Sequence, residues 1–212
     1  MNDSRVEFLG ETWLKLVRTT VKSGVPVAGE GLELLGVSVV FSAAVENDEL
    51  IREFGDRRMI DEMDHVFFAN GSGALGHSYA QLLRGPDGRS DFADIISLLR
   101  AEPASKRAVV TLCGTGGGKV PCVNVVQFLV REGSLRAIYF ARGQDAFKKF
   151  YADALCLAKM TRLVAEGLGM PAGTVSGFIG SSHVYHEDRA AIDDFLVRAD
   201  RFLLNGAPKG AA

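Results

Sequence analysis

The sequence lacks the features of a membrane protein, a signal-bearing secreted protein or a general nucleic-acid binder. None of its apolar runs approaches the roughly 18 residues that are needed to span a bilayer. Its net charge is only −2, so no broad positive field attracts nucleic acid and any anion site must be local. Charged residues interrupt the first apolar positions, so no signal peptide is expected. These absences predict a cytoplasmic protein that binds neither membrane nor nucleic acid.

Cysteine is scarce as well. The three cysteines, Cys113, Cys122 and Cys156, have no metal-ligand spacing and form no even set for disulfides. We therefore expect reduced thiols and no metal site. The chain has 212 residues, of which 47% are hydrophobic and 24% charged, a globular composition long enough for one sizeable core. No linker divides it, so we expect a single domain over residues 1–212.

Apolar periodicity predicts a mixture of helices and strands. Helical spacing covers residues 5–22, 47–63, 91–100 and 152–168, and strand-like stretches cover residues 32–44, 108–113, 123–130 and 135–141. The last two strands are expected to pair around Glu132-Gly133, and residues 32–44 to form a buried strand. Residues 70–76 are expected to form a loop and residues 205–212 a flexible tail. The order predicts an α+β fold, with one sheet and helices packed against it.

The glycine run from Gly114 to Lys119 resembles a phosphate loop only in composition. A phosphate loop needs its Gly-Lys to be followed by Ser or Thr at the start of a helix. Here Val120-Pro121 follows and leads into a strand. The run is therefore interpreted as a flexible connector.

Cys122 is the first candidate for chemistry, because it lies between Pro121 and an alternating apolar strand. A thiolate held rigidly there could attack an electron-poor carbon. The alternative is an ordinary buried cysteine, since free Cys is among the most buried residue types. The polar residues that follow favour the nucleophile: Arg142, Asp145, Asp153, His183 and Tyr185.

From Gly76 to about Asp188 the chain resembles thymidylate synthase and the related pyrimidine nucleotide hydroxymethylases. Four blocks at the family's spacing carry the resemblance: Pro121-Cys122 with Gln127-Phe128, Arg142-Gly143-Gln144-Asp145, Phe150-Tyr151-Ala152-Asp153 and Ser182-His183-Val184-Tyr185. Leu75–Tyr79 and Ser105-Lys106-Arg107 are similar to further family segments. The resemblance implies the thymidylate-synthase fold, a mixed sheet with packed helices, and a homodimer.

The resemblance also implies a reaction. Cys122 would add to C6 of a pyrimidine, and C5 would then attack the methylene carried by tetrahydrofolate. Hydride would complete a methyl group, whereas water would complete a hydroxymethyl group. Arg142 would lower the pKa of Cys122 and bind phosphate. The other implied site residues are Tyr79 among the catalytic groups, Gln127 and Asp145 on the substrate, His183 and Tyr185 on the sugar 3′ hydroxyl, and Lys106 and Arg107 on the phosphate bound by the other subunit.

Asp153 is the residue that discriminates between bases. Thymidylate synthases usually carry Asn here, which suits uracil, whereas cytidylate hydroxymethylases resemble this chain in carrying Asp. A protonated carboxyl matches cytosine, because it donates to N3 and accepts from the 4-amino group. Burial would raise the pKa of Asp153 towards that neutral form. The alternative is that Asp153 only caps the helix at 152–168.

Glu49 is the candidate general base, because Glu49-Leu50-Ile51 resembles the family's Glu-containing helix. The alternative is a solvated helix charge.

Several family features differ here. Residues 25–31 contain no basic residue where the family has a phosphate arginine, and Gly143 replaces a Ser. His65 and Phe67-Phe68 lie where the family often has Trp, and no counterpart of the folate-closing C-terminal segment follows. An open site would let water reach the exocyclic methylene, which favours a hydroxymethyl product over a methyl product. The alternative is that the site no longer binds folate.

Three hypotheses follow. The first is a CMP or dCMP 5-hydroxymethylase that uses methylenetetrahydrofolate, an activity known from phage DNA modification and nucleoside antibiotic pathways. The second is a UMP or dUMP C5-methyltransferase. The third is a non-catalytic nucleotide-binding homologue or partner subunit.

Overall fold

A mixed six-stranded sheet organises the chain in the computed structural model, which describes residues 7–29, 31–69, 79–83, 91–112 and 120–205. The strands lie in the order β1-β2-β6-β5-β4-β3, and only β5 and β6 run parallel. The elements are α1 (Leu9–Ser23), β1 (Val25–Val27), β2 (Gly31–Ser42), α2 (Glu49–Phe54), α3 (Arg57–Phe68), α4 (Tyr79–Leu82), α5 (Asp91–Ala101), β3 (Val109–Thr111), β4 (Val123–Arg131), β5 (Ser134–Asp145), α6 (Phe150–Leu168), β6 (Ala172–Tyr185), the 3-10 turn η1 (His186–Asp188) and α7 (Arg189–Leu204).

The central connections follow from local sequence. Glu132 and Gly133 join β4 to β5 with φ values of 51° and 73°, as a two-residue hairpin turn requires. Helix α6 then crosses back so that β6 can pair parallel with β5. It ends at Gly169, whose φ of 70° is the left-handed conformation typical of a helix C-terminus. The predicted hairpin and long helix are confirmed.

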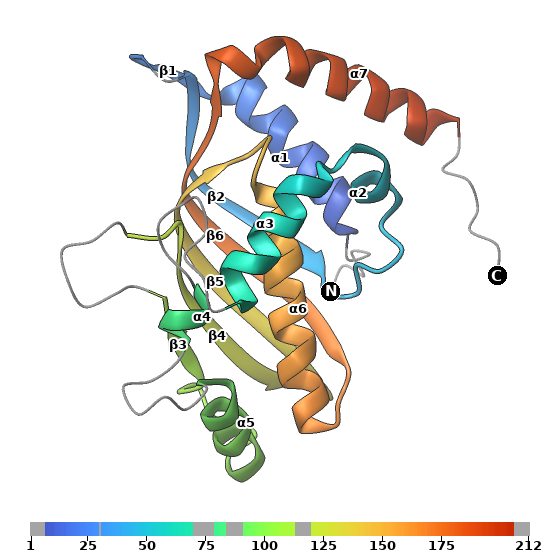
Figure 1. Ribbon diagram of the computed structural model, residues 1–212. Helices are drawn as coiled ribbons and strands as arrows, with labels where there is room; N and C mark the ends of the chain where they lie inside the picture. The colour runs from blue at the N-terminus through green and yellow to red at the C-terminus, as the bar shows by residue number, and fades with distance from the viewer. Residues whose placement is uncertain (1–6, 30, 70–78, 84–90, 113–119, 206–212) are drawn as a thin grey trace.

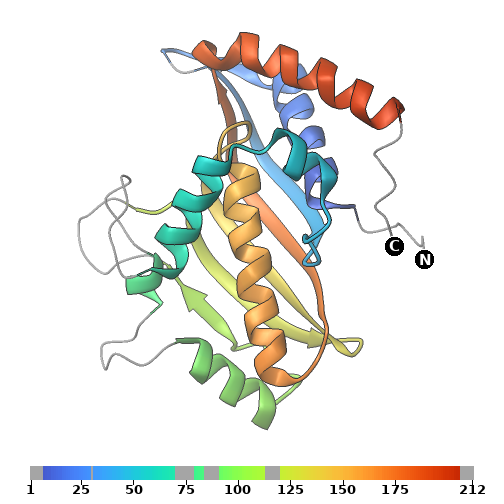
Figure 2. The same ribbon diagram turned by 45° about the vertical axis from the view of Figure 1, so that its right-hand side comes forward.

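The helices cover one face of the sheet, with α6 at the centre of that layer (Figure 1, Figure 2). Phe41, Phe128, Phe150 and Leu157 are fully buried between the two layers. The other face is not covered by any described helix. The prediction that residues 32–44 form a buried strand is therefore wrong, because alternate side chains of β2 point to the open face, as Val40 does with 48% of its surface exposed.

A kink crosses three strands and turns their ends towards α6. The β2–β6 ladder passes from Leu35–Ser181 to Val37–Ile179 without a Gly36–Gly180 pair. Gly36 has a φ of 68°, and a Cβ on Gly180 would lie 2.8 Å from the carbonyl oxygen of Arg142. Just before the kink every second residue of β6 is buried, and Ile179 is the last of these. After the kink the intervening residues are buried instead: Ser182 and Val184 on β6, and Gln144 on β5. This change brings polar residues to the helix-covered side.

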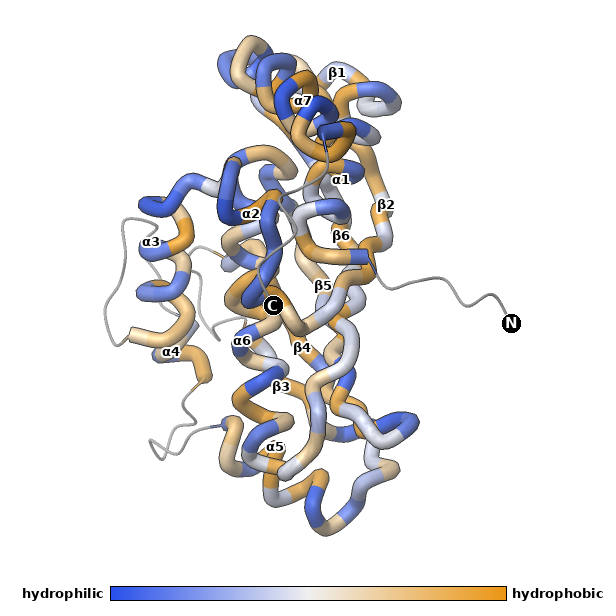
Figure 3. The backbone as a smooth tube through the Cα atoms, turned by 90° about the vertical axis from the view of Figure 1, so that its right-hand side faces the viewer, coloured by the Kyte–Doolittle hydropathy of each residue, from blue (hydrophilic) through white to orange (hydrophobic). Residues whose placement is uncertain are grey.

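Other sequence predictions need correction. The segment 47–63 forms two helices, α2 and α3, because Asp56 begins a second helix by accepting a hydrogen bond from the backbone N–H of Arg58. Helix α1 starts at Leu9 rather than at residue 5, since Phe8 is extended. Helix α7 was not anticipated. It crosses one end of the molecule with alternating polar and apolar residues (Figure 3) and ends at Leu204, immediately before the residues for which a tail is expected.

Some expectations lie outside the described residues. These are the loop at 70–76, the connector at Gly114–Lys119 and most of the tail at 205–212. Within the described ranges, no helix is long and apolar enough to cross a membrane.

Candidate active site

Cys122 immediately precedes β4 and is partly exposed, whereas Cys156 on α6 is only 3% exposed. The backbone beside the thiol is held on both sides. The hydroxyl of Tyr79 accepts a hydrogen bond from the N–H of Val123 at 3.1 Å, and the amide of Asn124 donates to the carbonyl of Pro121 at 2.8 Å. Cys122 is therefore a positioned and accessible thiol, unlike Cys156.

Arg142 holds the same loop from the neighbouring strand. Its backbone N–H donates to the carbonyl of Cys122 at 2.9 Å. Its guanidinium donates to the carbonyl of Val120 at 2.8 Å through Nη2, and Nε lies 3.1 Å from the carbonyls of both Val120 and Pro121. The hydrogen bonds of Arg142 therefore fix the backbone of Val120, Pro121 and Cys122.

The charges around Cys122 do not favour the thiolate in the free protein. Burial raises the pKa of Cys122, and the carboxylate of Asp153 raises it further, while Lys149 and then Arg142 lower it. Arg142 acts in the predicted direction. Its effect is smaller than those of burial, Asp153 and Lys149, so the pKa of Cys122 is raised overall. Loss of the negative charge on Asp153 would lower the pKa of Cys122 and favour the thiolate.

Asp153 lies in the first turn of α6 and is 1% exposed. Its Oδ2 accepts a hydrogen bond from Nε2 of Gln144 at 2.7 Å, while Oδ1 is buried and has no hydrogen-bond partner among the described residues. Burial raises the pKa of Asp153, and Lys149 and Gln144 only partly oppose this. The helix-capping interpretation is wrong, because α6 begins at Phe150 and Asp153 makes no capping bond.

Tyr79 completes the group around the thiol. It is 1% exposed, and its ring lies against Phe67 with centroids 4.1 Å apart. Burial raises the pKa of Tyr79, and the charges of Asp153 and Cys122 raise it further. Tyr79 is therefore a neutral hydroxyl in this site.

Asp145, His183 and Tyr185 lie together at the ends of β5 and β6. Asp145 pairs with His183 across the parallel ladder, and the rings of His183 and Tyr185 meet edge to face at 5.2 Å. The carboxylate of Asp145 accepts from the N–H groups of Phe147 and Lys148. Burial raises the pKa of Asp145, while those two bonds and His183 lower it.

Sequence reasoning missed Lys149 and gave Gln144 no role. The charge of Lys149 acts on both Cys122 and Asp153. Lys149 and Asp153 are four residues apart, the spacing at which opposite charges meet on a helix. Lys149 is the residue immediately before α6, so the four-residue spacing to Asp153 was visible in the sequence.

Four predicted residues are engaged in other contacts in the free chain. Glu49 opens α2, and its carboxylate lies 3.8 Å from Arg52 of the same helix. Gln127 donates to the carbonyl of Lys106 at 2.8 Å. Arg107 is exposed and forms an ion pair with Glu102 at 2.6 Å. Gln127 is five residues along β4 from Cys122, roughly 17 Å for an extended strand. Lys106 and Arg107 therefore lie far from the thiol of their own chain.

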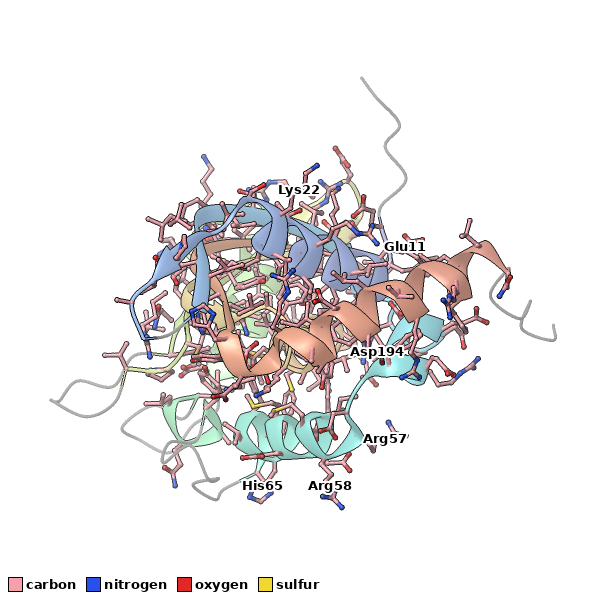
Figure 4. All side chains as sticks on the ribbon, turned by 90° about the horizontal axis from the view of Figure 1, so that it is seen from above. Glu11, Lys22, Arg57, Arg58, His65 and Asp194 are labelled. Carbon is pink, nitrogen blue, oxygen red and sulfur yellow. The ribbon has the colours of Figure 1, made fainter. Side chains whose placement is uncertain are left out.

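Of the residues at the family's Trp region, His65 and Phe68 border the same cavity. Phe67 is buried, and His65 points outward from α3 (Figure 4). Phe68 borders a cavity of about 610 Å³, and the ammonium of Lys159 lies 4.2 Å from its ring centre. The chain's one tryptophan, Trp13, packs in the core between Tyr151 and Phe195. No cluster of metal-ligand residues occurs within the described ranges.

The structure thus brings a partly exposed thiol, a buried carboxyl and two strand ends with polar groups into one region. The comparisons with known proteins indicate the family. A thymidylate synthase family model matches residues 47–205. A Methanosarcina barkeri protein named "Putative thymidylate synthase" is 25% identical over 155 residues, 71% of this chain and 68% of its own length. The thymidylate synthase of Listeria innocua is 26% identical over 162 residues, 72% of this chain and 50% of its own.

The chain therefore belongs to the thymidylate synthase family. That family consists of transferases, which move a one-carbon unit from methylenetetrahydrofolate to C5 of a pyrimidine nucleotide. The chain spans about two thirds of the Methanosarcina relative and half of the Listeria one.

The raised pKa of Asp153 predicts a pH-dependent stability. A carboxyl whose pKa is higher in the folded state contributes stability below its unfolded pKa, about 4, and loses that contribution as pH rises through the folded pKa. Asp153→Asn is neutral at every pH. We expect it to increase the urea unfolding midpoint relative to wild type at pH 8 and to leave less difference at pH 4.

Asp56→Asn is the matched control, since Asp56 is exposed at the start of α3 and Asn also caps a helix well. It should show no such pH dependence. A constant difference between Asp153→Asn and wild type across pH 4–8 would contradict the assignment.

Proposed function

We propose that this protein is a cytidylate C5 hydroxymethylase, acting on CMP or dCMP with Cys122 as its nucleophile. The observation that supports this most directly is Asp153, a buried carboxyl with a raised pKa and a free Oδ1 within electrostatic range of the thiol. The one-carbon source proposed is methylenetetrahydrofolate, as in the family. No step below depends on how it binds.

The chemistry of cytosine fits the neutral form of Asp153. When sulfur adds to C6, the C5–C6 electron pair moves towards C4 and negative charge develops on N3. A proton on Oδ1 would donate to N3 at the position where this charge appears, which is the arrangement that stabilises a transition state. Oδ2, already held by Gln144, can also accept from the 4-amino group.

Neutralising Asp153 also affects the nucleophile. Its carboxylate is the main charge that raises the pKa of Cys122, so a proton on Asp153 favours the thiolate. Binding of cytosine, which needs that proton, would therefore increase the reactivity of Cys122. Glu49 and Tyr79 are proposed for proton transfer at C5, Arg142 and Asp145 for the substrate's phosphate and base, and His183 and Tyr185 for the sugar.

The bare face of the sheet supports a homodimer. Apolar side chains are exposed across four of its strands, with fractional exposures of 48% for Val40, 37% for Phe140, 47% for Phe178 and 40% for Val109. The rings of Phe140 and Phe178 stack at 6.1 Å. Such a patch marks an interface. A second copy is the proposed occupant, because Lys106 and Arg107 shortly precede β3, an edge strand of the sheet, and would reach the partner's site.

A uridylate C5-methyltransferase is the alternative. The family name favours it, whereas the acid at position 153 opposes it, because uracil presents N3–H as a donor rather than an acceptor.

Release of tritium from pyrimidine C5 tests the proposed nucleophile. Wild type should release tritium from [5-³H]CMP or dCMP, because addition at C6 makes C5 exchangeable. Cys122→Ala should abolish release while nucleotide affinity stays within a few fold, and Cys156→Ala should release at the wild-type rate. Release by Cys122→Ala at that rate would contradict the assignment, and release only from uridylate would favour the alternative. Release from neither nucleotide would favour the hypothesis of a non-catalytic nucleotide-binding homologue or partner subunit.

Asp153→Asn tests the choice of base. The amide keeps the size and the bond from Gln144 but cannot offer an acid proton to N3. Leaving one buried partner unpaired costs about 1–3 kcal/mol, so the cytidylate-to-uridylate ratio of kcat/KM should fall roughly 5- to 150-fold. Steady-state kinetics on both nucleotides measure this ratio. An unchanged ratio would show that Asp153 does not determine which base is bound.

Phe178→Asp tests the dimer. A charge in the centre of the apolar face should convert a dimer into a monomer in sedimentation velocity and abolish tritium release. Val197→Asp is the matched control, because Val197 is 50% exposed on α7, away from this face, and the variant should stay dimeric. Mixing Arg107→Ala with Cys122→Ala should restore release through heterodimers with one complete site. A monomeric wild type would overturn the arrangement.

A further inference from the structure

The chain that leads from Cys122 into β4 departs from regular strand geometry. Val123 and Val125 pair with two consecutive residues of β5, so one residue of β4 has no place in the regular ladder. That extra residue is Asn124, and the irregularity is a β-bulge. Bulges are frequent beside active sites, where they change the direction of a side chain.

The bulge decides which side chains at the start of β4 reach the core. Val126 and Phe128 are buried at a spacing of two residues. A regular strand would continue this alternation back to positions 124 and 122. The structure instead buries Val123 completely and leaves Asn124 and Cys122 partly exposed. The extra residue therefore moves the thiol off the buried register and makes it accessible.

The side-chain amide of Asn124 holds the bulge through two hydrogen bonds. Its Nδ2 donates to the carbonyl of Pro121 at 2.8 Å, one residue before the thiol. Its Oδ1 accepts from the backbone N–H of Arg142 on β5 at 3.1 Å, and the same N–H donates to the carbonyl of Cys122 at 2.9 Å. The amide thus ties the residue before the thiol to the neighbouring strand.

These two bonds need a donor and an acceptor on one short side chain. Asn provides both, whereas a carboxylate only accepts and an apolar side chain does neither. The backbone of Asn124 is fixed as well, since its carbonyl accepts from the N–H of Leu112 at 2.7 Å. Immediately after the thiol, the N–H of Val123 donates to the hydroxyl of Tyr79 at 3.1 Å. The bulged segment therefore also carries the contact to Tyr79, a second proposed catalytic group.

We propose that Asn124 is a positioning residue, which keeps Cys122 accessible by stabilising the β-bulge at the start of β4. Its effect on catalysis rests on the proposed nucleophile, whereas its effect on the exposure of the thiol depends on the bulge alone. Without the amide, the strand loses the two bonds that favour the bulge. The regular register then competes, with Cys122 on the side on which Val126 is buried.

Alkylation of Cys122 by iodoacetamide, followed by mass spectrometry of its peptide, measures the exposure of the thiol. Asn124→Ala removes both bonds, and Asn124→Leu removes them while keeping the branched shape of the side chain. Each variant should react at Cys122 about tenfold more slowly than wild type, because the net contribution of one hydrogen bond shifts a balance of two registers roughly tenfold.

Ser134→Ala is the matched control. The hydroxyl of Ser134 also donates to a backbone carbonyl three residues earlier, that of Arg131 at 3.3 Å, but at the far end of the same two strands. This variant should react at Cys122 at the wild-type rate.

Tritium release from cytidylate measures the consequence for catalysis. A displacement of about 1 Å at a reacting group can reduce a rate about 100-fold, so Asn124→Ala should reduce kcat about 10- to 100-fold. KM should stay within about threefold, because the residues proposed to bind the nucleotide lie on β5, β6 and α6. Thermal melting establishes that each variant is folded, and Asn124→Leu carries the same comparison if Asn124→Ala does not fold.

Alkylation of Cys122 at the wild-type rate in the folded Asn124 variants would overturn the role of Asn124. A wild-type kcat in a variant that is alkylated slowly would overturn its link to catalysis. Slow alkylation of the variants, together with no tritium release by wild type, would support the effect of the bulge on the thiol and contradict the proposed nucleophile. The two failures are therefore distinguishable.

Discussion

The hydrogen bond between Gln144 and Asp153 is the contact on which the site depends. It joins the end of β5 to the first turn of α6 in a buried position, 2.7 Å from nitrogen to oxygen. A carboxyl placed there loses hydration and receives only one donor, so its neutral form is favoured. The same burial leaves Oδ1 without a partner and ready for a ligand. The properties of Asp153, and through it of Cys122, follow from this one junction between helix and sheet.

The kink through Gly36, Gly180 and Arg142 makes that junction possible. A regular strand would alternate its side chains without change, and Gln144 would then point to the open face. The kink shifts the alternation, so polar residues on the last part of β5 and β6 turn towards α6. It needs a left-handed φ at Gly36 and a backbone at Gly180 that no Cβ obstructs. Two glycines thereby determine where the polar groups of the site lie.

The open sheet face and the incomplete phosphate site are two aspects of one arrangement. All described helices lie on the other face, so apolar side chains such as Phe140 and Phe178 remain exposed. Lys106 and Arg107 precede the edge strand β3 and lie far from their own Cys122. The proposed second copy would cover the apolar surface and exchange the basic residues between sites.

The sequence by itself determined the family, the central hairpin and the long helix, because these depend on local spacing and on motif residues. It also made Cys122, Asp153 and Asp145 candidates for the site. It could not show that β2 is half exposed, since an apolar strand looks alike whether one or both faces are covered. It gave Lys149 no role, because the charge of that residue acts on a thiol that is far away in the sequence. The tertiary structure alone decided the balance of charge at the thiol. Burial and the charges of Asp153, Lys149 and Arg142 act there through space, from segments that only the fold brings together.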